Sequence, residues 1–362
     1  MSQYRKPLVA LILVLLLPVI DSYLPQDLVT SDLLRPIFIF AILGLGLNIV
    51  VGYTGLLNLG VAGFMAIGAY TYSILTCDIY PFRFGFWSAV PSAIVMGAVA
   101  GILLGLPTIR LRGDYLAIVT LGFGEIIQDS LKNLEVITKG IQSINPLPNP
   151  TVLKLRFEGI QPVFFAEALT AEDYRPWYYL FLAILLVAIL LVRNLERSRF
   201  GRALISIRED ELASSCMGIH PVKNKLLAFA FGASLCSLAG ALYASHLGSS
   251  GEPGNYDFLV SVVALCIVIV GGMGSIPGVL LGAVVMIGFN SILLVKLNTF
   301  LMQQGLVSTE NVFSQPNNWK YFIFGFALIL TMRYRPEGLL PVSERKSRPE
   351  PEGEARSSQS SA

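Results

Sequence analysis

The sequence predicts an all-α polytopic membrane protein with about ten transmembrane helices and both termini in the cytoplasm. Two observations lead to this fold class. Hydrophobic residues make up 54% of the 362 residues and charged residues only 14%, whereas soluble domains carry roughly 25% charge. Four long stretches, 36–77, 84–109, 226–251 and 258–295, contain no Asp, Glu, Lys or Arg. The composition excludes a soluble enzyme, and the net charge of +2 excludes a nucleic-acid-binding protein.

The charge-free stretches locate the membrane spans. A helix needs about 20 apolar residues to cross the hydrocarbon, so 36–77 and 258–295 are each long enough for two. Polar or glycine-rich residues interrupt both runs, at 52–60 and 271–278, and each run is therefore interpreted as a helix, a break and a helix. The remaining spans are expected at 7–24, 84–109, 115–131, 177–193, 226–251 and 319–333.

The first apolar segment, 7–24, could be a signal peptide or an uncleaved first helix. Arg5 and Lys6 precede it, and basic residues at this position are compatible with either a signal peptide or a first helix. The residues that follow it, from Asp21 to Pro25, do not form a small-residue cleavage site. The segment is therefore expected to remain as the first span.

The distribution of Lys and Arg predicts the orientation. Basic residues gather in cytoplasmic loops of membrane proteins. With the N-terminus inside, most of the basic residues fall in the segments expected inside, above all 193–225 and the C-terminal tail. Residues 1–341 then form the membrane domain, and 132–176 is an external loop. The tail 342–362 is rich in Ser, Glu, Arg and Pro and is expected to be disordered.

Polar residues at the first break are candidates for a translocation path. Asn48, Tyr53, Thr54 and Asn58 lie in or beside it. An unwound backbone at membrane depth must be buried in protein or line a water-filled cavity. One interpretation is that the break faces a path through the bundle. The other is that the asparagine side chains only hydrogen-bond neighbouring helices.

Glu125 is the remaining path candidate. It lies four residues before Asp129, so that the two carboxylates share a helix face. Carboxylates at mid-membrane mark functional pathways, which would make these residues a proton relay. Alternatively, the 115–131 helix is short or tilted, and Glu125, Asp129 and Lys132 approach the outer surface. Glu125 has the better claim to face a water-filled cavity.

The stretch 193–225 predicts a docking site for a soluble partner. Its acidic cluster belongs in the first turn of a helix, and Gly218 and Pro221 are typical of a helix end. A short helix is thus expected from Glu209 to Met217, in the cytoplasm. An acidic helix is unsuited to lipid headgroups, which are themselves negative. The candidate docking residues are Arg202, Arg208, Glu209, Asp210, Glu211 and Gly218.

Six segments in this order resemble the permease subunits of branched-chain amino acid ABC importers, the LivM-like family. They are GLNIVVGYTGLLNLGVAGFMAIGAY (46–70), RLRGDYLAIVTLGFGEI (110–126), FGRALISIREDELASSCMGI (200–219), KLLAFAFGASLCSLAGALYA (225–244), GGMGSIPGVLLGA (271–283) and RPEGLL (335–340). The sequence departs from the family at Val61, where members usually have His, and in the 132–176 loop, which lacks their usual Gly-rich stretch. Both departures concern the cargo.

The resemblance implies a transport subunit in a bacterial plasma (inner) membrane. Its partners would be two ATP-binding cassette subunits, a homologous second permease and an extracytoplasmic solute-binding protein. In this family 200–219 is the coupling region that docks on the ATPase. The chain has no Gly-Lys pair and hence no phosphate-binding loop, so ATP would be bound and hydrolysed on a separate chain. No cofactor of its own is expected, because the four cysteines form no CxxC pair and His220 and His246 are far apart.

Three alternatives compete with an importer of hydrophobic amino acids. Related permeases carry urea or short amides, which is the second choice of cargo. An ion-coupled secondary transporter would normally place acids on its broken helices, and the two breaks contain none. A membrane enzyme is disfavoured because the chain has two histidines, no metal motif and no clustered carboxylates within its spans.

Overall fold

The structure, a computed structural model, describes residues 34–108, 114–148, 174–289, 319–335 and 337–340. Within these residues all regular secondary structure is helical. The elements are α2 (Arg35–Thr54), α3 (Val61–Thr76), α4 (Phe86–Thr108), α5 (Asp114–Asn133), α6 (Glu135–Thr138), η4 (Gly140–Gln142), α7 (Tyr174–Arg197), α8 (Arg199–Glu209), α9 (Glu211–Cys216), α10 (Pro221–Leu247), η5 (Pro253–Tyr256), α11 (Phe258–Gly271), α12 (Ile276–Gly288) and α14 (Lys320–Tyr334).

The predicted spans coincide with helices wherever the structure describes them. Both long charge-free runs divide as expected, the first into α2 and α3 and the second into α11 and α12. The first break is shorter than predicted: Gly52, Tyr53 and Thr54 still belong to α2, and the interruption covers 55–60. The all-helical membrane class is therefore supported, with five of the described helical stretches long and apolar enough to cross a membrane.

Three predicted features lie outside the described residues: the first span 7–24, the tail 342–362 and most of the external loop 132–176. The total of ten spans and the placement of both termini therefore remain predictions. The described part of the loop, 132–148, carries the short helices α6 and η4.

Helix α10 is the central packing element, and it contacts α2, α3 and α4 along its length. Small residues make this close approach possible. A Cβ added at Gly68 or Gly97 would overlap Ser237 of α10, and one at Gly46 would meet the backbone of Gly232 at 2.8 Å. Since α2 is also almost entirely buried, the core of the bundle lies between α2, α3, α4 and α10.

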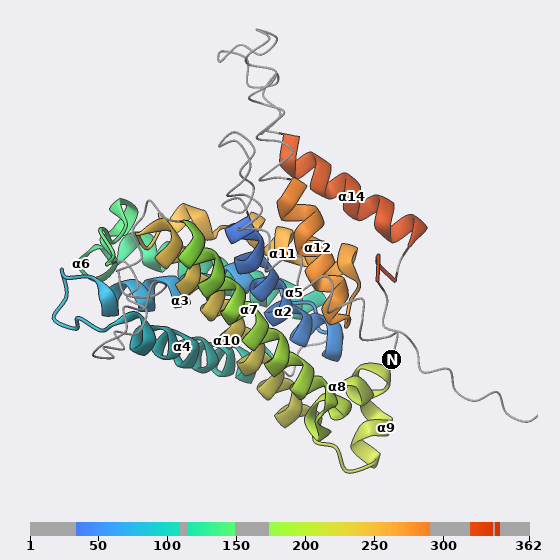
Figure 1. Ribbon diagram of the computed structural model, residues 1–362. Coiled ribbons are helices and arrows are strands. Elements are labelled where there is room, and N and C mark those ends of the chain that lie inside the picture. Colours follow the sequence, from blue (N-terminus) through green and yellow to red (C-terminus); the bar gives the residue numbers. More distant parts are fainter. Residues whose placement is uncertain (1–33, 109–113, 149–173, 290–318, 336, 341–362) are drawn as a thin grey trace, which may run out of the picture.

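The loops gather at two opposite ends of the bundle (Figure 1). At one end lie α8, α9 and the α11–α12 turn, where Leu340 N–H donates to Gly271 O at 3.0 Å. At the other end lie α6, η4 and η5, where Leu147 N–H donates to Gly248 O at 2.9 Å. Among the described residues, the segments expected inside thus share one end and those expected outside share the other, as alternating spans require.

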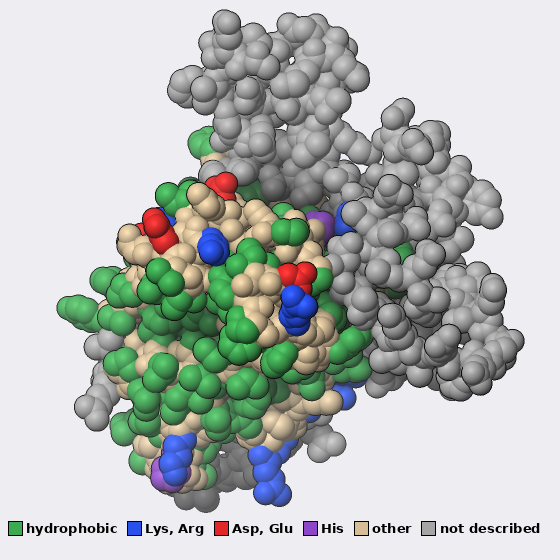
Figure 2. Space-filling view, turned by 90° about the vertical axis from the view of Figure 1, so that its left-hand side faces the viewer, with side chains coloured by type: hydrophobic (Ala, Val, Ile, Leu, Met, Phe, Trp, Pro, Cys, Tyr) green, Lys and Arg blue, Asp and Glu red, His purple; other side chains and the backbone are tan. Residues whose placement is uncertain are grey.

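The surface between these ends is apolar. Figure 2 shows a broad band of hydrophobic side chains across the visible face, with charged side chains gathered above and below it. Large apolar side chains of α4 are exposed, among them Val95, Leu103 and Leu106. Such a band matches a surface that faces lipid, because lipid tails leave no polar partner for exposed polar groups.

Candidate translocation and coupling sites

The break between α2 and α3 exposes backbone amides that the two helices cannot satisfy by themselves. The first turn of any helix leaves its N–H groups without intrahelical partners, and no bulk water is available inside a bundle. Side chains take the place of that water here. Asn58 Oδ1 accepts from Gly60 N–H at 2.9 Å, Thr120 Oγ1 from Leu59 N–H at 3.0 Å, and Ser261 Oγ from Ala62 N–H at 3.0 Å.

Asn48 joins the first broken run to the second. Its side chain is fully buried in α2, and its Oδ1 accepts from Gly274 N–H at 2.8 Å in the α11–α12 turn. A Cβ at Gly52, one turn further along α2, would lie 2.6 Å from the same Gly274 nitrogen. The end of α2 is therefore packed directly against the α11–α12 turn.

Four of the five candidate path residues, all except Glu125, are buried in this conformation. Thr54 Oγ1 donates to Val50 O within its own helix at 2.6 Å, and Tyr53 is buried beside it. Asn48 bonds the neighbouring α11–α12 turn, in line with the helix-bridging alternative, whereas Asn58 accepts from Gly60 within the break itself. Their place on a translocation path remains a prediction, and it requires that the break open from the present arrangement.

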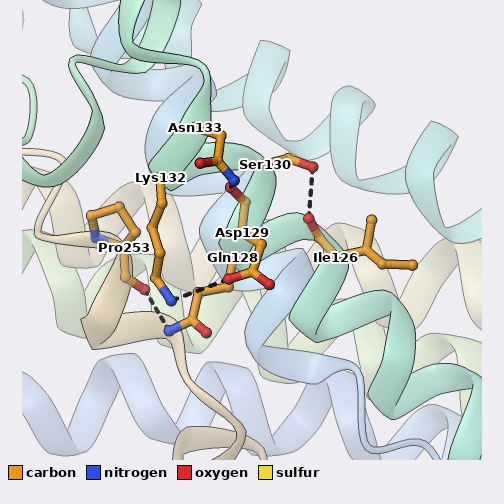
Figure 3. Close-up of polar contacts among 7 residues, drawn as sticks. All are labelled: Ile126, Gln128, Asp129, Ser130, Lys132, Asn133 and Pro253. Atoms are coloured by element: carbon orange, nitrogen blue, oxygen red, sulfur yellow. Dashed lines mark hydrogen bonds and ion pairs between the residues drawn. The ribbon is translucent and has the colours of Figure 1, made fainter.

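Figure 3 shows the last turns of α5 beside Pro253 of η5, in the part of the bundle that is expected to face outward. Asp129 and Lys132 form an exposed ion pair of 3.3 Å, while the buried Gln128 donates through Nε2 to Pro253 O of η5 at 3.1 Å. These contacts favour the interpretation in which this helix approaches the outer surface. Glu125, one turn earlier, is half-buried and has no hydrogen-bond or ion-pair partner among the described residues.

The described residues also contain no group of three or more His, Cys, Asp or Glu side chains that could hold a metal ion.

A proton relay needs neighbouring titratable groups, and Glu125 is not joined to Asp129, which is paired with Lys132 instead. The geometry therefore gives the relay interpretation no support in the part of the chain that is described.

The coupling region folds into two helices rather than one. The predicted helix from Glu209 to Met217 is wrong at its start, because Glu209 is the last residue of α8. Asp210 is extended and caps α9, its carboxylate accepting from Leu212 N–H at 2.8 Å and Ala213 N–H at 2.9 Å. Because the Asp210 side chain caps α9, the chain is stabilised as two helices separated at this residue and not as one continuous helix. Only Glu211 of the acidic cluster lies in the first turn of α9.

The end of this short helix agrees with the prediction. Helix α9 ends at Cys216, and Gly218 follows with φ +84°. A residue with a Cβ is strained in this left-handed region, whereas glycine is not. The three candidate docking residues Asp210, Glu211 and Gly218 therefore shape α9 itself.

Helix α9 is fixed to the bundle along one side only. Glu211 forms a 2.7 Å ion pair with Lys225 of α10, whose side chain is almost fully buried. Ser214 and Ser206 share a 2.7 Å hydrogen bond between α9 and α8. The other side is open: Leu212 is 76% exposed and Met217 is 83% exposed. This apolar surface lies at the end of the bundle that is expected to face the cytoplasm.

The two candidate arginines of α8 reach in different directions. Arg202 is exposed, and its guanidinium donates to Arg197 O at 2.9 Å, near the start of the helix. Arg208 instead donates through Nη1 to Gly52 O of α2 at 2.6 Å. Both arginines are exposed, but only Arg208 hydrogen-bonds the end of α2, next to the first helix break.

Four contributors to these sites were not identified from the sequence. Thr120 and Ser261 were overlooked because hydroxyl residues inside apolar helices are common, and nothing in their spacing pointed to the break. Lys225 carried a usable signal, since it stands at the border of a charge-free run and extends no basic cluster. The C-terminal segment 337–340, whose Leu339 N–H donates to Val270 O at 2.9 Å, was noticed only through the family resemblance.

Comparison with known proteins agrees with this architecture. The family described as branched-chain amino acid transport system / permease component matches residues 29–332. The high-affinity branched-chain amino acid transport system permease protein LivM of Escherichia coli K12 is 40% identical over 87% of this chain and 70% of its own length.

More distant relatives match as well. A probable branched-chain amino acid transport permease LivM of Methanocaldococcus jannaschii is 24% identical over 84% of this chain and 90% of its own length. The E. coli permease protein LivH is 23% identical over 68% of this chain and 79% of its own length. No solved structure matches significantly. Because the family match extends through nearly all of the described helices, the chain belongs to the family of permease components of branched-chain amino acid transport systems.

Proposed function

We propose that this protein is the membrane permease subunit of an ATP-driven importer, and that it forms the path for branched-chain or other hydrophobic amino acids. The observation that carries this proposal is the family match over residues 29–332, together with 40% identity to a LivM permease. The helical bundle with its apolar outer band supports a transport role within the membrane.

The translocation path is proposed to run beside the 55–60 break, along Asn48, Tyr53, Thr54, Asn58 and Glu125. An interrupted helix inside an apolar bundle supports this location, because its backbone polar groups can be presented to a passing solute once the bundle opens. In the present arrangement Asn48 joins α2 to the α11–α12 turn, and Asn58 accepts from Gly60 within the break. Opening would have to separate the end of α2 from its neighbours.

The ATPase is proposed to be a separate chain that docks on α9 and the adjoining surface of α8. The exposed Leu212 and Met217 give α9 an apolar contact surface, and Arg202 and Glu209 lie exposed next to it. Two such ATP-binding subunits would serve the complex, and this chain would bind no cofactor of its own.

The remaining partners follow from the same proposal. A second, homologous permease chain would complete the path, as the similarity to both LivM and LivH proteins suggests. An extracytoplasmic solute-binding protein would deliver the amino acid to the outer end, where η4 and η5 lie. The assembly would reside in the bacterial inner membrane.

Competition for uptake tests the function and the cargo together. Cells that lack their own branched-chain amino acid importers would express this chain with its partner subunits and take up radiolabelled leucine. We expect unlabelled isoleucine and valine to compete with leucine, and a hundredfold excess of urea or acetamide to have no effect. A matched strain with an ATPase subunit whose phosphate-loop lysine is replaced should take up no leucine. Absence of leucine uptake, together with ATP-dependent uptake of radiolabelled urea, would assign the cargo to the short amides.

A further inference from the structure

The coupling region touches the first helix break directly, through one side chain. We propose that Arg208 is the positioning residue that makes α8, α9 and the end of α2 move as one unit, so that a movement of the ATPase reaches the 55–60 break. This inference rests on the proposed function. It assigns to Arg208, whose side chain is otherwise exposed, a contact with α2 of the same chain.

Arg208 contacts the end of α2 through a hydrogen bond. Arg208 Nη1 donates to Gly52 O at 2.6 Å. The last four carbonyl groups of a helix have no intrahelical partner, and Gly52 lies two residues before the end of α2. A guanidinium at this position satisfies one such carbonyl and lies at the negative end of the helix dipole. Hydrogen bonds from a charged donor are also stronger than neutral ones.

The Arg208 side chain also packs against the start of the break. Gly55, the first residue after α2, has φ +70°, and a Cβ there would lie 3.3 Å from Arg208 Cγ. The hydrocarbon part of Arg208 thus lies beside the residue at which the helix ends. A displacement of α8 toward or away from α2 would act first on this point.

The two helices joined by Arg208, α8 and α2, are each held to a further element. On the cytoplasmic side, Ser206 and Ser214 hold α8 to α9. On the bundle side, the end of α2 is held to the α11–α12 turn by the Asn48 hydrogen bond to Gly274. Arg208 therefore lies between a short helix with an exposed apolar surface and the two interrupted runs of the bundle.

Substitution of Arg208 in the assembled transporter tests the proposal by function. Arg208→Gln removes the charge, and Arg208→Lys keeps the charge but loses the planar fork. We expect both variants to assemble with the ATPase and to hydrolyse ATP at the basal rate. Leucine uptake per ATP hydrolysed should fall roughly tenfold or more in Arg208→Gln, as expected for loss of one charged hydrogen bond, and less in Arg208→Lys. Arg199→Gln, at the exposed start of α8, is the matched control and should behave as wild type.

A distance measurement provides a readout that does not depend on activity. Cys216 is an exposed native cysteine on α9, whereas Cys77, Cys236 and Cys266 are buried. A second spin label on Leu57→Cys, in the break, gives a label pair across the Arg208 contact. We expect the distance between the labels to be the same in nucleotide-free and ATP-trapped transporter with Arg208 present, and to differ between the two states in Arg208→Gln.

Three outcomes would overturn the proposal. One is uptake per ATP in Arg208→Gln within twofold of wild type. Another is a parallel loss of assembly, basal hydrolysis and uptake, which would make the residue merely structural. The last is a label distance that changes between states with Arg208 present. In each case, ATP-driven uptake by the wild type and by Arg199→Gln would leave the proposed function unaffected. If neither protein showed ATP-driven uptake, the proposed function itself would be contradicted.

Discussion

Single hydroxyl and amide side chains replace water at the interruptions of the transmembrane helices. Thr120 and Ser261 accept from amides around the start of α3, and Asn48 accepts from the α11–α12 turn. Each of these side chains is buried. A buried donor that loses its partner costs about 1–3 kcal/mol, so these residues hold the breaks in one defined geometry.

Replacement of Thr120 by Val should therefore destabilise the bundle although the two side chains have nearly the same shape. The substitution leaves Leu59 N–H without its acceptor at 3.0 Å, and we expect a loss of about 1–3 kcal/mol. Thr76→Val is the matched control, because the Thr76 hydroxyl only donates to Tyr72 O of its own helix. Thermal unfolding in detergent checks both. Equal stability of the two variants would show that Thr120 does not support the break.

The residues of the breaks also show what sequence reasoning could not supply. Asn48 and Asn58 could be chosen as candidates because amides are rare in charge-free runs. Their partners could not be named, since Gly274 is 226 residues away from Asn48 and such pairs are defined only by the packing of the bundle. The helix-bridging alternative describes the contact of Asn48, but Asn58 bonds the nearby Gly60.

At the scale of elements, the coupling region depends on one capping residue. The acidic cluster and Gly218 correctly indicated a short helix ahead of α10. The start of that helix was misplaced because three successive acids suit the first turn of a helix equally well. What distinguishes them is the extended backbone of Asp210, which separates α8 from α9 and lets its carboxylate accept two amides.

Asp210→Ala should consequently loosen α9 and weaken the response of the ATPase. Loss of an N-terminal cap costs about 1 kcal/mol, and α9 has only six residues to compensate. We expect reduced ATP hydrolysis in response to loaded binding protein, measured on the reconstituted complex. Asp210→Asn retains a capping oxygen and should keep most of the response, and Glu209→Ala, at the end of α8, should have less effect than Asp210→Ala. If Asp210→Asn were as defective as Asp210→Ala, the charge rather than the cap would be responsible.

The packing of α10 gives a second prediction at this scale. Gly68→Ala introduces a Cβ that would overlap the backbone of Ser237 and force α3 and α10 apart. Gly122→Ala in α5 places the same methyl group where no atom lies within 4 Å, and alanine is the better helix former by about 1 kcal/mol. We expect the first variant to be recovered in much lower yield after size-exclusion chromatography and the second to match wild type. Normal recovery of Gly68→Ala would contradict the close approach of α3 and α10.

On the scale of the whole molecule, the described loops gather at two opposite ends of the bundle, and the charge pattern predicts which end faces the cytoplasm. The charge-free runs predicted the positions of the helices, because a membrane span can be recognised from the composition of the chain alone. The clustering of α8, α9, the α11–α12 turn and residues 337–340 at one end required the fold, but it agrees with the alternation of loops predicted from Lys and Arg. The connection from α9 through Arg208 to the first break could not be foreseen from charge or hydropathy.

The central claim is that this bundle opens in response to ATP hydrolysed on a partner chain, and not to an ion gradient. The most direct measurement is radiolabelled leucine uptake into proteoliposomes that contain all partner chains, with the binding protein outside. The account predicts uptake when ATP is enclosed and no ion gradient exists, unchanged by a protonophore and by Glu125→Gln. Uptake that appears only after a proton or sodium gradient is imposed would contradict the account and would make Glu125 the first residue to examine.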